Sequence, residues 1–191
     1  MSKSNGTPRP ISPILRSIGA VTIAARTTRL VPKKAFVVNT GKGARVKIAY
    51  VDPEFIAWFG DKIEKPTGKT TLRYQIFTRP AAFAQAVQEN RDIGFVTKTT
   101  PGELFSMLAK QPDGPKSPAG PLATNDYANL FEMDDISGIP RLVNVFWRFR
   151  GNGWNVYARE KSLSIQWCNG HQLFSRVSCR RSDARPPRPR R

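Results

Sequence analysis

One C-terminal stretch constrains the fold more than any other part of the chain. It runs from Arg141 to Arg176 and contains two turn signals, Gly151-Asn152-Gly153 and Asn169-Gly170, and three of the four tryptophans, Trp147, Trp154 and Trp167. Apolar and polar residues alternate on both sides of the first turn, as they do in strands with one buried face. Glycine and asparagine at such turns are typical of hairpins. We therefore predict a four-stranded antiparallel meander, rich in tryptophan, whose large aromatic side chains face the core.

The segments before this stretch carry both helix and strand signals. The Asp52-Pro53 pair starts a helix, because Asp is a favourable N-cap and Pro suits the first helical position. Thr100 and Glu103 form a capping box for a second helix. Residues 71–77 alternate as a strand does, and residues 80–90 carry one apolar helical face. The predicted fold class is α+β, with a mainly antiparallel sheet packed on two or three short helices.

Two Gly-Lys sequences raise the question of phosphate binding. Residues 35–39 and 44–51 flank the turn at 40–43, so we predict a hairpin there, although its Gly-Lys-Gly tip would also suit a phosphate. The sequence at 66–71 looks like part of a nucleotide-binding P-loop. A P-loop needs a glycine where this chain has Ile63, and no apolar strand precedes the motif. We therefore reject nucleotide hydrolysis at this position.

Positive charge is concentrated at the two ends of the chain. The net charge is +17, and residues 1–45 hold nine Lys or Arg and no acidic residue. Residues 175–191 hold seven Arg and one Asp, whereas residues 46–174 hold 15 basic and 13 acidic residues. Proline-rich and like-charged segments cannot bury a core. We therefore predict a flexible basic arm at 1–32, an α+β domain at 33–178 and an Arg/Pro-rich disordered tail at 179–191.

This charge distribution leads to the functional hypothesis. A polycation binds phosphate polymers through the release of counterions. We expect a non-enzymatic nucleic-acid-binding or ribonucleoprotein-associated protein that holds the phosphate backbone of RNA or DNA with flexible basic arms. The alternatives are a protein-interaction module that docks an acidic partner, an anionic membrane surface, and a tail without a dedicated partner. The candidate phosphate contacts are Lys33, Lys34, Lys42, Arg45, Arg148, Arg150, Arg159, Arg180, Arg181, Arg185, Arg188, Arg190 and Arg191.

Catalytic and metal-binding residues are scarce. His171 is the only histidine, and it lies in a turn near Cys168, without an orienting third group. The spacing of Cys168 and Cys179 matches no metal site, and we favour free thiols over a disulfide. We also favour core packing over base stacking for the tryptophans, because they alternate with polar residues. We therefore expect no catalytic residue, cofactor or bound metal, and an enzyme acting on an anionic substrate ranks last.

The hydropathy of the chain bears on its location. It contains no run of 18 apolar residues, so we expect no membrane span. Residues 18–25 follow several basic residues and faintly resemble the apolar part of a signal peptide, and an acid-free N-terminus also resembles a transit peptide. We expect a cytoplasmic protein, and a targeting peptide at the N-terminus stays open as the alternative.

Several short sequence motifs are distributed along residues 50–178. They are Trp58-Phe59, Lys62-Ile63-Glu64, Thr71-Leu72-Arg73-Tyr74, Leu104-Phe105-Ser106-Met107, Lys110-Gln111, the run from Asn125 to Phe131, Gly153-Trp154-Asn155-Val156 and Leu173-Phe174-Ser175-Arg176. This series resembles a family of uncharacterised proteins from ultra-small bacteria of the candidate phyla. The resemblance implies a bacterial domain with a shared aromatic core, and it implies no particular activity. The long basic ends depart from the family pattern, so they are the parts from which a specific partner could be inferred.

Overall fold

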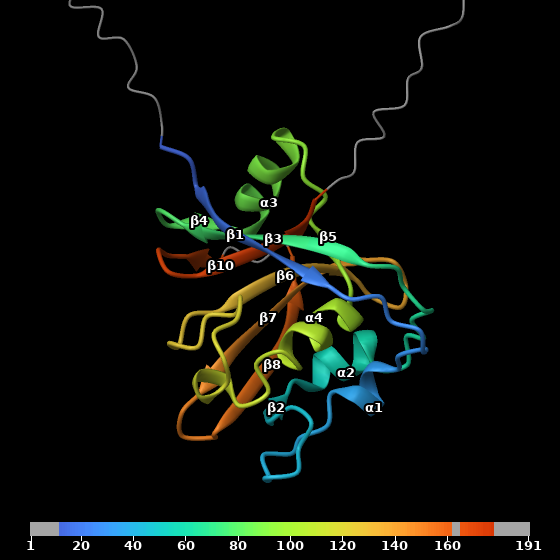
Figure 1. Cartoon of the computed structure of the whole chain (residues 1–191). Coiled ribbons are helices and arrows are strands. Elements are labelled where there is room, and N and C mark those ends of the chain that lie inside the picture. Colours follow the sequence, from blue (N-terminus) through green and yellow to red (C-terminus); the bar gives the residue numbers. More distant parts are fainter. Residues whose placement is uncertain (1–11, 162–164, 178–191) are drawn as a thin grey trace, which may run out of the picture.

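The computed structural model describes residues 12–161 and 165–177, and its centre is an eight-stranded mixed sheet (Figure 1). Seven strands follow the order β1-β3-β10-β6-β7-β8-β2, and β5 pairs with β6 outside that path. Neighbours are antiparallel except for β10 with β6, β2 with β8 and β5 with β6. The strands are β1 (Leu15–Ile23), β2 (Ile48–Val51), β3 (Thr70–Phe77), β5 (Lys98–Thr99), β6 (Asn129–Asp134), β7 (Pro140–Arg148), β8 (Gly153–Glu160) and β10 (Gln172–Arg176).

Helices pack on the sheet in two separate groups, which gives the protein two hydrophobic cores. One core joins β7 and β8 to α1 (Pro32–Ala35), α2 (Pro53–Phe59) and α4 (Pro101–Leu108). The other core joins the opposite side of the sheet to α3 (Phe83–Asp92) and to the short pair β4 (Ala81–Ala82) and β9 (Gln166–Trp167). A 3₁₀ turn, η1 (Gly114–Lys116), follows α4. Figure 1 shows α3 at one end of the molecule and the other three helices toward the opposite end.

The local signals of the sequence are confirmed where they concern helix starts. Asp52 Oδ1 accepts a hydrogen bond of 3.2 Å from the backbone N–H of Glu54 at the start of α2. At the start of α4, Thr100 Oγ1 accepts from the Glu103 N–H at 3.2 Å, and Glu103 Oε2 accepts from the Thr100 N–H at 2.9 Å. These bonds satisfy N–H groups that have no partner within the helix. The predicted α+β class with a mostly antiparallel sheet is likewise confirmed, although the described residues form four short helices rather than two or three.

The predicted four-stranded meander is wrong beyond its first hairpin. Strands β7 and β8 do form an antiparallel pair, but β9 pairs with β4, and β10 lies between β3 and β6. Leu173, Phe174 and Ser175 of β10 are all fully buried, as expected for a strand inside a sheet with both faces covered. The three tryptophans of this region are buried, with Trp147, Trp154 and Trp167 at most 8% exposed.

The expected flexible arm over residues 1–32 does not hold for residues 12–32. Strand β1 pairs with β3 along its length, from Leu15 opposite Phe77 to Ile23 opposite Thr70. The backbone N–H groups of Ile14 and Leu15 donate to the Glu89 carboxylate of α3 at 2.8 and 2.9 Å. The domain therefore extends at least 18 residues before the expected boundary at 33. The remainder of the arm, and the tail at 179–191, lie outside the described residues.

The hairpin predicted over residues 35–51 is also wrong. Residues 32–35 form α1, and only an isolated bridge between Asn39 and Ile48 joins the two expected strands. Strand β2 instead pairs in parallel with β8 and forms an edge of the sheet. Ile48 is 1% exposed and belongs to the same hydrophobic core as Trp154 of β8. This burial favours pairing of β2 with β8 over the predicted pairing with residues 35–39. The intervening residues form an open loop.

Candidate nucleic-acid interface

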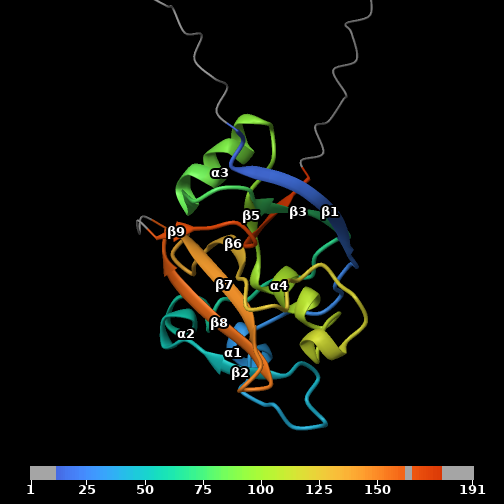
Figure 2. The ribbon, with the colours of Figure 1, turned by 90° about the vertical axis from the view of Figure 1, so that its left-hand side faces the viewer.

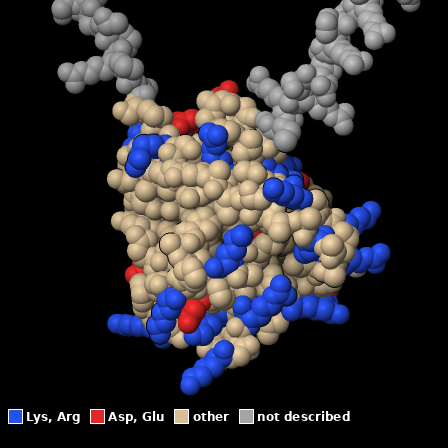
Figure 3. All heavy atoms as spheres, viewed as in Figure 1, with Lys and Arg blue, Asp and Glu red and all other residues tan. Residues whose placement is uncertain are grey.

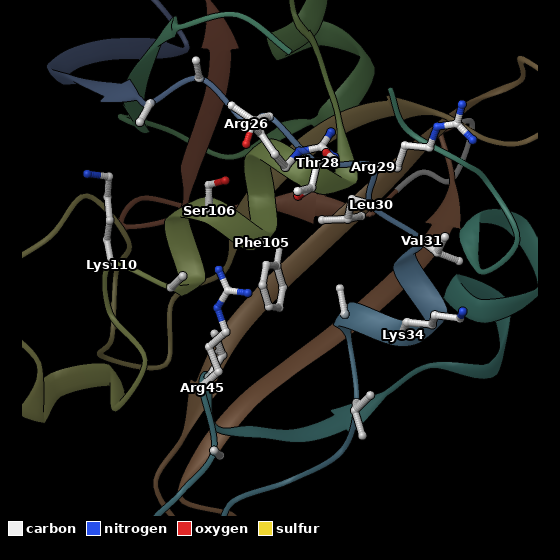
Figure 4. Close-up of a pocket in the computed structure, with 18 of the residues that line it drawn as sticks. Arg26, Thr28, Arg29, Leu30, Val31, Lys34, Arg45, Phe105, Ser106 and Lys110 are labelled. Carbon is white, nitrogen blue, oxygen red and sulfur yellow. The ribbon is translucent and has the colours of Figure 1, made fainter. Parts of the chain in front are cut away.

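An open cleft of about 850 Å³ lies between the segment after β1, helix α1, the loop before β2 and the end of α4 (Figure 4). Its lining contains five cationic side chains and no carboxylate, histidine or cysteine. We call it the basic cleft. Its cations come from four separate parts of the chain: Arg26 and Arg29, Lys34, Arg45, and Lys110.

Four of these cations are available to a ligand. Arg29, Lys34 and Lys110 are exposed, and none of them has an ion pair or side-chain hydrogen bond with a described residue. The Arg45 guanidinium lies 5.4 Å from the centre of the Phe105 ring, a contact that orients it without neutralising it. Lys110 and Lys34 lie on opposite sides of the cleft in Figure 4. The cleft therefore presents positive charge from several directions to whatever occupies it.

Arg26 has a structural role in the cleft wall. Its guanidinium donates to Glu64 Oε2 at 3.1 Å, to the Lys65 carbonyl at 3.0 Å and to the Thr28 carbonyl at 2.7 Å. Glu64 Oε2 also accepts from the Gly102 N–H at 2.9 Å, so the pair ties this segment to the start of α4. Any side chain at Gly102 would overlap this carboxylate. Burial raises the pKa of Glu64, and the Gly102 hydrogen bond and the Arg26 charge only partly oppose this effect.

The structure brings together only some of the predicted phosphate contacts. Lys34 and Arg45 line the basic cleft, whereas Lys33 forms an ion pair with Asp61 and Lys42 lies exposed on the loop outside the lining. The tail residues Arg180, Arg181, Arg185, Arg188, Arg190 and Arg191 lie outside the described part of the chain.

Sequence reasoning missed two of the four available cations of the cleft, Arg29 and Lys110, as well as the structural Arg26. Arg29 belongs to the acid-free run at 1–45, so the charge distribution could have suggested it. Lys110 looks like an ordinary cation at the end of a helix, and nothing near it in the sequence links it to Arg45. Lys110 and Arg45 line the same cleft only because α4 packs against the loop before β2.

The remaining predicted arginines lie on a different surface, at the β7–β8 end of the sheet. The Arg148 guanidinium lies 4.7 Å from the centre of the Phe146 ring, and that of Arg159 lies 5.8 Å from the centre of the Tyr157 ring. Arg150 and Arg148 line a shallow cavity of about 620 Å³ there. These arginines therefore do not extend the basic cleft directly.

His171 is held as a neutral structural residue. Its Nδ1 accepts a hydrogen bond of 2.9 Å from the Ala128 N–H, and its ring packs edge-on against Tyr127 and Trp167. Burial lowers the pKa of His171. Cys168 is exposed, and only its carbonyl contacts His171, by accepting from the backbone N–H at 3.3 Å. This arrangement contains no pair of a nucleophile and a base.

Two further searches concern the described residues only. Within 12–161 and 165–177, no group of three or more His, Cys, Asp or Glu side chains is placed to hold a metal ion. None of the helices in these ranges has the length and apolar character needed to cross a membrane.

Comparisons with protein-family models, curated proteins and solved structures found no match. The family resemblance of the sequence therefore stays a prediction, and the functional argument depends on the geometry of the site.

Proposed function

We propose that the protein is a non-enzymatic, sequence-tolerant nucleic-acid-binding protein that holds the phosphate backbone in the basic cleft. The observation that carries this proposal is the set of four cations, Arg29, Lys34, Arg45 and Lys110, that line one open cleft without a carboxylate. Such a cleft concentrates positive potential, and a polyanion gains affinity by releasing counterions when it enters. The arginines between 180 and 191 would add to the same sequence-independent attraction.

The shape and chemistry of the cleft favour binding over catalysis. Its lining lacks the His, Asp, Glu and Cys side chains that most often act as general base, general acid or nucleophile. Ser106 Oγ, the hydroxyl on α4, donates to the Gly102 carbonyl at 2.8 Å and has no base beside it. An enzyme acting on an anionic substrate therefore has no support in this cleft.

Positive charge also dominates the wider surface around the cleft. In the face shown in Figure 3, blue Lys and Arg side chains far outnumber red acidic ones, mainly over the half of the molecule that contains α1, α2 and α4. A ligand longer than the cleft would meet further cations on this face. This supports a polymer of phosphates over a single small anion.

The test uses full-length protein and fluorescence anisotropy with a labelled single strand and a labelled duplex over a series of salt concentrations. The cleft variant combines Lys34→Gln, Arg45→Gln and Lys110→Gln. Its matched control combines Arg16→Gln, Lys69→Gln and Lys116→Gln, exposed cations that lie outside the cleft lining. Each lost phosphate contact should reduce the slope of log K against log salt by about 0.7 for a single strand and about 0.9 for a duplex.

We expect the cleft variant to lose roughly two units of slope for the single strand, and the control to lose much less. Equal losses in the two variants would show that binding follows total charge, and the cleft proposal would fail. Absence of binding by the wild-type protein at low salt would overturn nucleic-acid binding altogether. Equally tight binding of polyglutamate would favour the acidic protein partner instead.

A further inference from the structure

Four aromatic side chains form a surface at the end of the sheet formed by β7, β8 and β2. Phe146 and Tyr157 stack with ring centres 5.4 Å apart and planes 9° apart, and Tyr50 lies 5.1 Å from Tyr157. Tyr50 is 39% exposed and Phe149, just beyond the end of β7, is 58% exposed. We call this surface the aromatic face; its members are Tyr50, Phe146, Phe149 and Tyr157 together with Arg148, Arg150 and Arg159.

The outer part of the aromatic face is open: Phe146 packs at the border of the core around α3, whereas Tyr50 and Phe149 lie exposed beyond it. Phe146 lies between Val145 and Trp147, whose side chains belong to the core with α1, α2 and α4, so its own ring points to the opposite side of the sheet. On that side, the core around α3 contains Leu142 and Leu130, nearer the other end of β7 and β6. Figure 2 shows β7 and β8 running across the molecule to their hairpin, far from α3.

Arginines are interleaved with these rings. Arg148 and Arg159 lie over Phe146 and Tyr157, and neither they nor Arg150 form an ion pair with a described residue. Asp126 is the only carboxylate among the residues lining the shallow cavity on this face. Flat rings thus alternate with cations that form no ion pair with a described residue. This combination suits a ligand with both aromatic planes and negative charges.

We infer that the aromatic face stacks the bases of a single-stranded nucleic acid while Arg148, Arg150 and Arg159 contact its phosphates. The inference rests on the proposed function and specifies the form of nucleic acid. A duplex cannot occupy this surface in the same way, because its bases are stacked on each other inside the helix. An apolar peptide would leave the three arginines without partners.

The aromatic face and the basic cleft meet at β2, an edge strand of the sheet. Arg45 lines the cleft just before β2, and Tyr50 lies within β2 on the aromatic face. The loop before β2 and the β7–β8 hairpin lie at the same end of the molecule (Figures 1 and 2). A single nucleic-acid strand that passes around this edge of the sheet would place its phosphates in the basic cleft and its bases on the aromatic face.

The experiment compares two ligands with equal charge: a fluorescent oligothymidylate and an abasic oligomer of the same length. The aromatic-face variant is Tyr50→Ala with Phe149→Ala, the two most exposed rings. The control variant is Ile63→Ala with Ile136→Ala, which removes side chains that are 63% and 57% exposed elsewhere on the protein. Circular dichroism establishes that all variants are folded.

We expect wild-type protein to bind oligothymidylate at least about tenfold more tightly than the abasic oligomer. The aromatic-face variant should lose about tenfold or more for oligothymidylate and show little change for the abasic oligomer. Tyr50→Phe with Phe149→Tyr should retain the wild-type affinity, because both rings remain. The control should behave as the wild type does.

The outcomes separate this inference from the proposed function. Equal wild-type affinity for both ligands, or an unchanged aromatic-face variant, overturns base stacking. In those cases a loss in the cleft variant Lys34→Gln, Arg45→Gln and Lys110→Gln still supports nucleic-acid binding. If neither oligomer binds at low salt, the proposed function fails and the inference fails with it.

Discussion

Trp154 provides a direct test of how the tryptophans stabilise the fold. It is fully buried, its Nε1–H donates to the Gln111 carbonyl at 2.9 Å, and its ring meets Trp147 edge-on at 5.5 Å. Trp167 is the matched comparison, because it is 8% exposed and its Nε1–H has no partner among the described residues. Replacing each by Phe removes the same ring atoms, but only Trp154→Phe removes a hydrogen bond.

The expected magnitudes follow from these differences. Losing the second ring of a buried tryptophan should cost roughly 2 kcal/mol, including the cavity it leaves. The lost hydrogen bond adds about 1 kcal/mol, and no more, because the Gln111 carbonyl still accepts from the Gly114 N–H at 3.1 Å. We therefore expect Trp154→Phe to reduce the free energy of unfolding by about 3 kcal/mol and Trp167→Phe by about 1 to 2 kcal/mol.

Urea denaturation followed by far-ultraviolet circular dichroism measures both values, because the unfolding midpoint and slope are obtained within each variant from a signal dominated by the backbone. Equal losses for the two variants, or a larger loss for Trp167→Phe, would refute the assigned role of the Trp154 hydrogen bond. A loss near zero for Trp154→Phe would refute its place in the core.

Two further predictions concern pH and cleft charge. Burial lowers the pKa of His171 below 6.5, so its stabilising effect is complete above that value and is lost as the pH falls through the lowered folded-state pKa. Urea titrations from pH 7 to pH 5 should therefore show a fall in wild-type stability that His171→Gln lacks, and parallel curves would contradict this assignment. Glu64→Gln removes the carboxylate that pairs with Arg26, so it should lower the stability of the protein, and it should raise oligonucleotide affinity a few-fold at low salt where the variant is folded. The oligonucleotide affinity of the wild-type protein should also rise as the pH falls toward the raised pKa of Glu64, because protonation removes the same negative charge. Anisotropy curves that do not change with pH or with the substitution would argue against a link between this carboxylate and the cleft.

Helix starts could be predicted from the sequence because their signals lie within one turn of chain. Asp52 bonds the N–H two residues later, and Thr100 exchanges hydrogen bonds with Glu103 three residues later. Strand partners are different, because alternation reports which residues point the same way and carries no information about the neighbouring strand. Strand β10 has the same pattern beside β9 or between β3 and β6, so the meander was the simplest interpretation.

Strand β1 was not predicted from the sequence, for a related reason. It is an edge strand, and its exposed middle has few buried side chains between Leu15 and Ile23. Its arginine and small residues therefore resemble an arm without a core. What holds it is backbone pairing with β3, together with the Glu89 hydrogen bonds to its start, and neither leaves a hydrophobic pattern in the sequence.

The sequence predicted that the protein presents positive charge, but it predicted only partly where the cations lie in the structure. Lys34 and Arg45 are close in the chain and fall within the acid-free run, so composition alone pointed to them. Lys110 joins them only through the packing of α4, which no local pattern reveals. The aromatic face was also missed, since it depends on which side of the sheet the helices leave open.

Burial explains how a nearly neutral central segment can present a basic surface. Four carboxylates of the described residues are at most 7% exposed, and each forms an ion pair with an Arg or Lys: Glu64, Glu103, Glu132 and Asp135. In contrast, no Lys or Arg in the described ranges is buried. Charge counts along the sequence therefore overstate the acidity that a ligand meets, because these four carboxylates lie inside the protein. A phosphate polymer approaching within the roughly 8 Å screening distance of physiological salt therefore meets exposed cations such as Lys34 and Lys110, whereas the buried carboxylates lie behind the surface and are already paired.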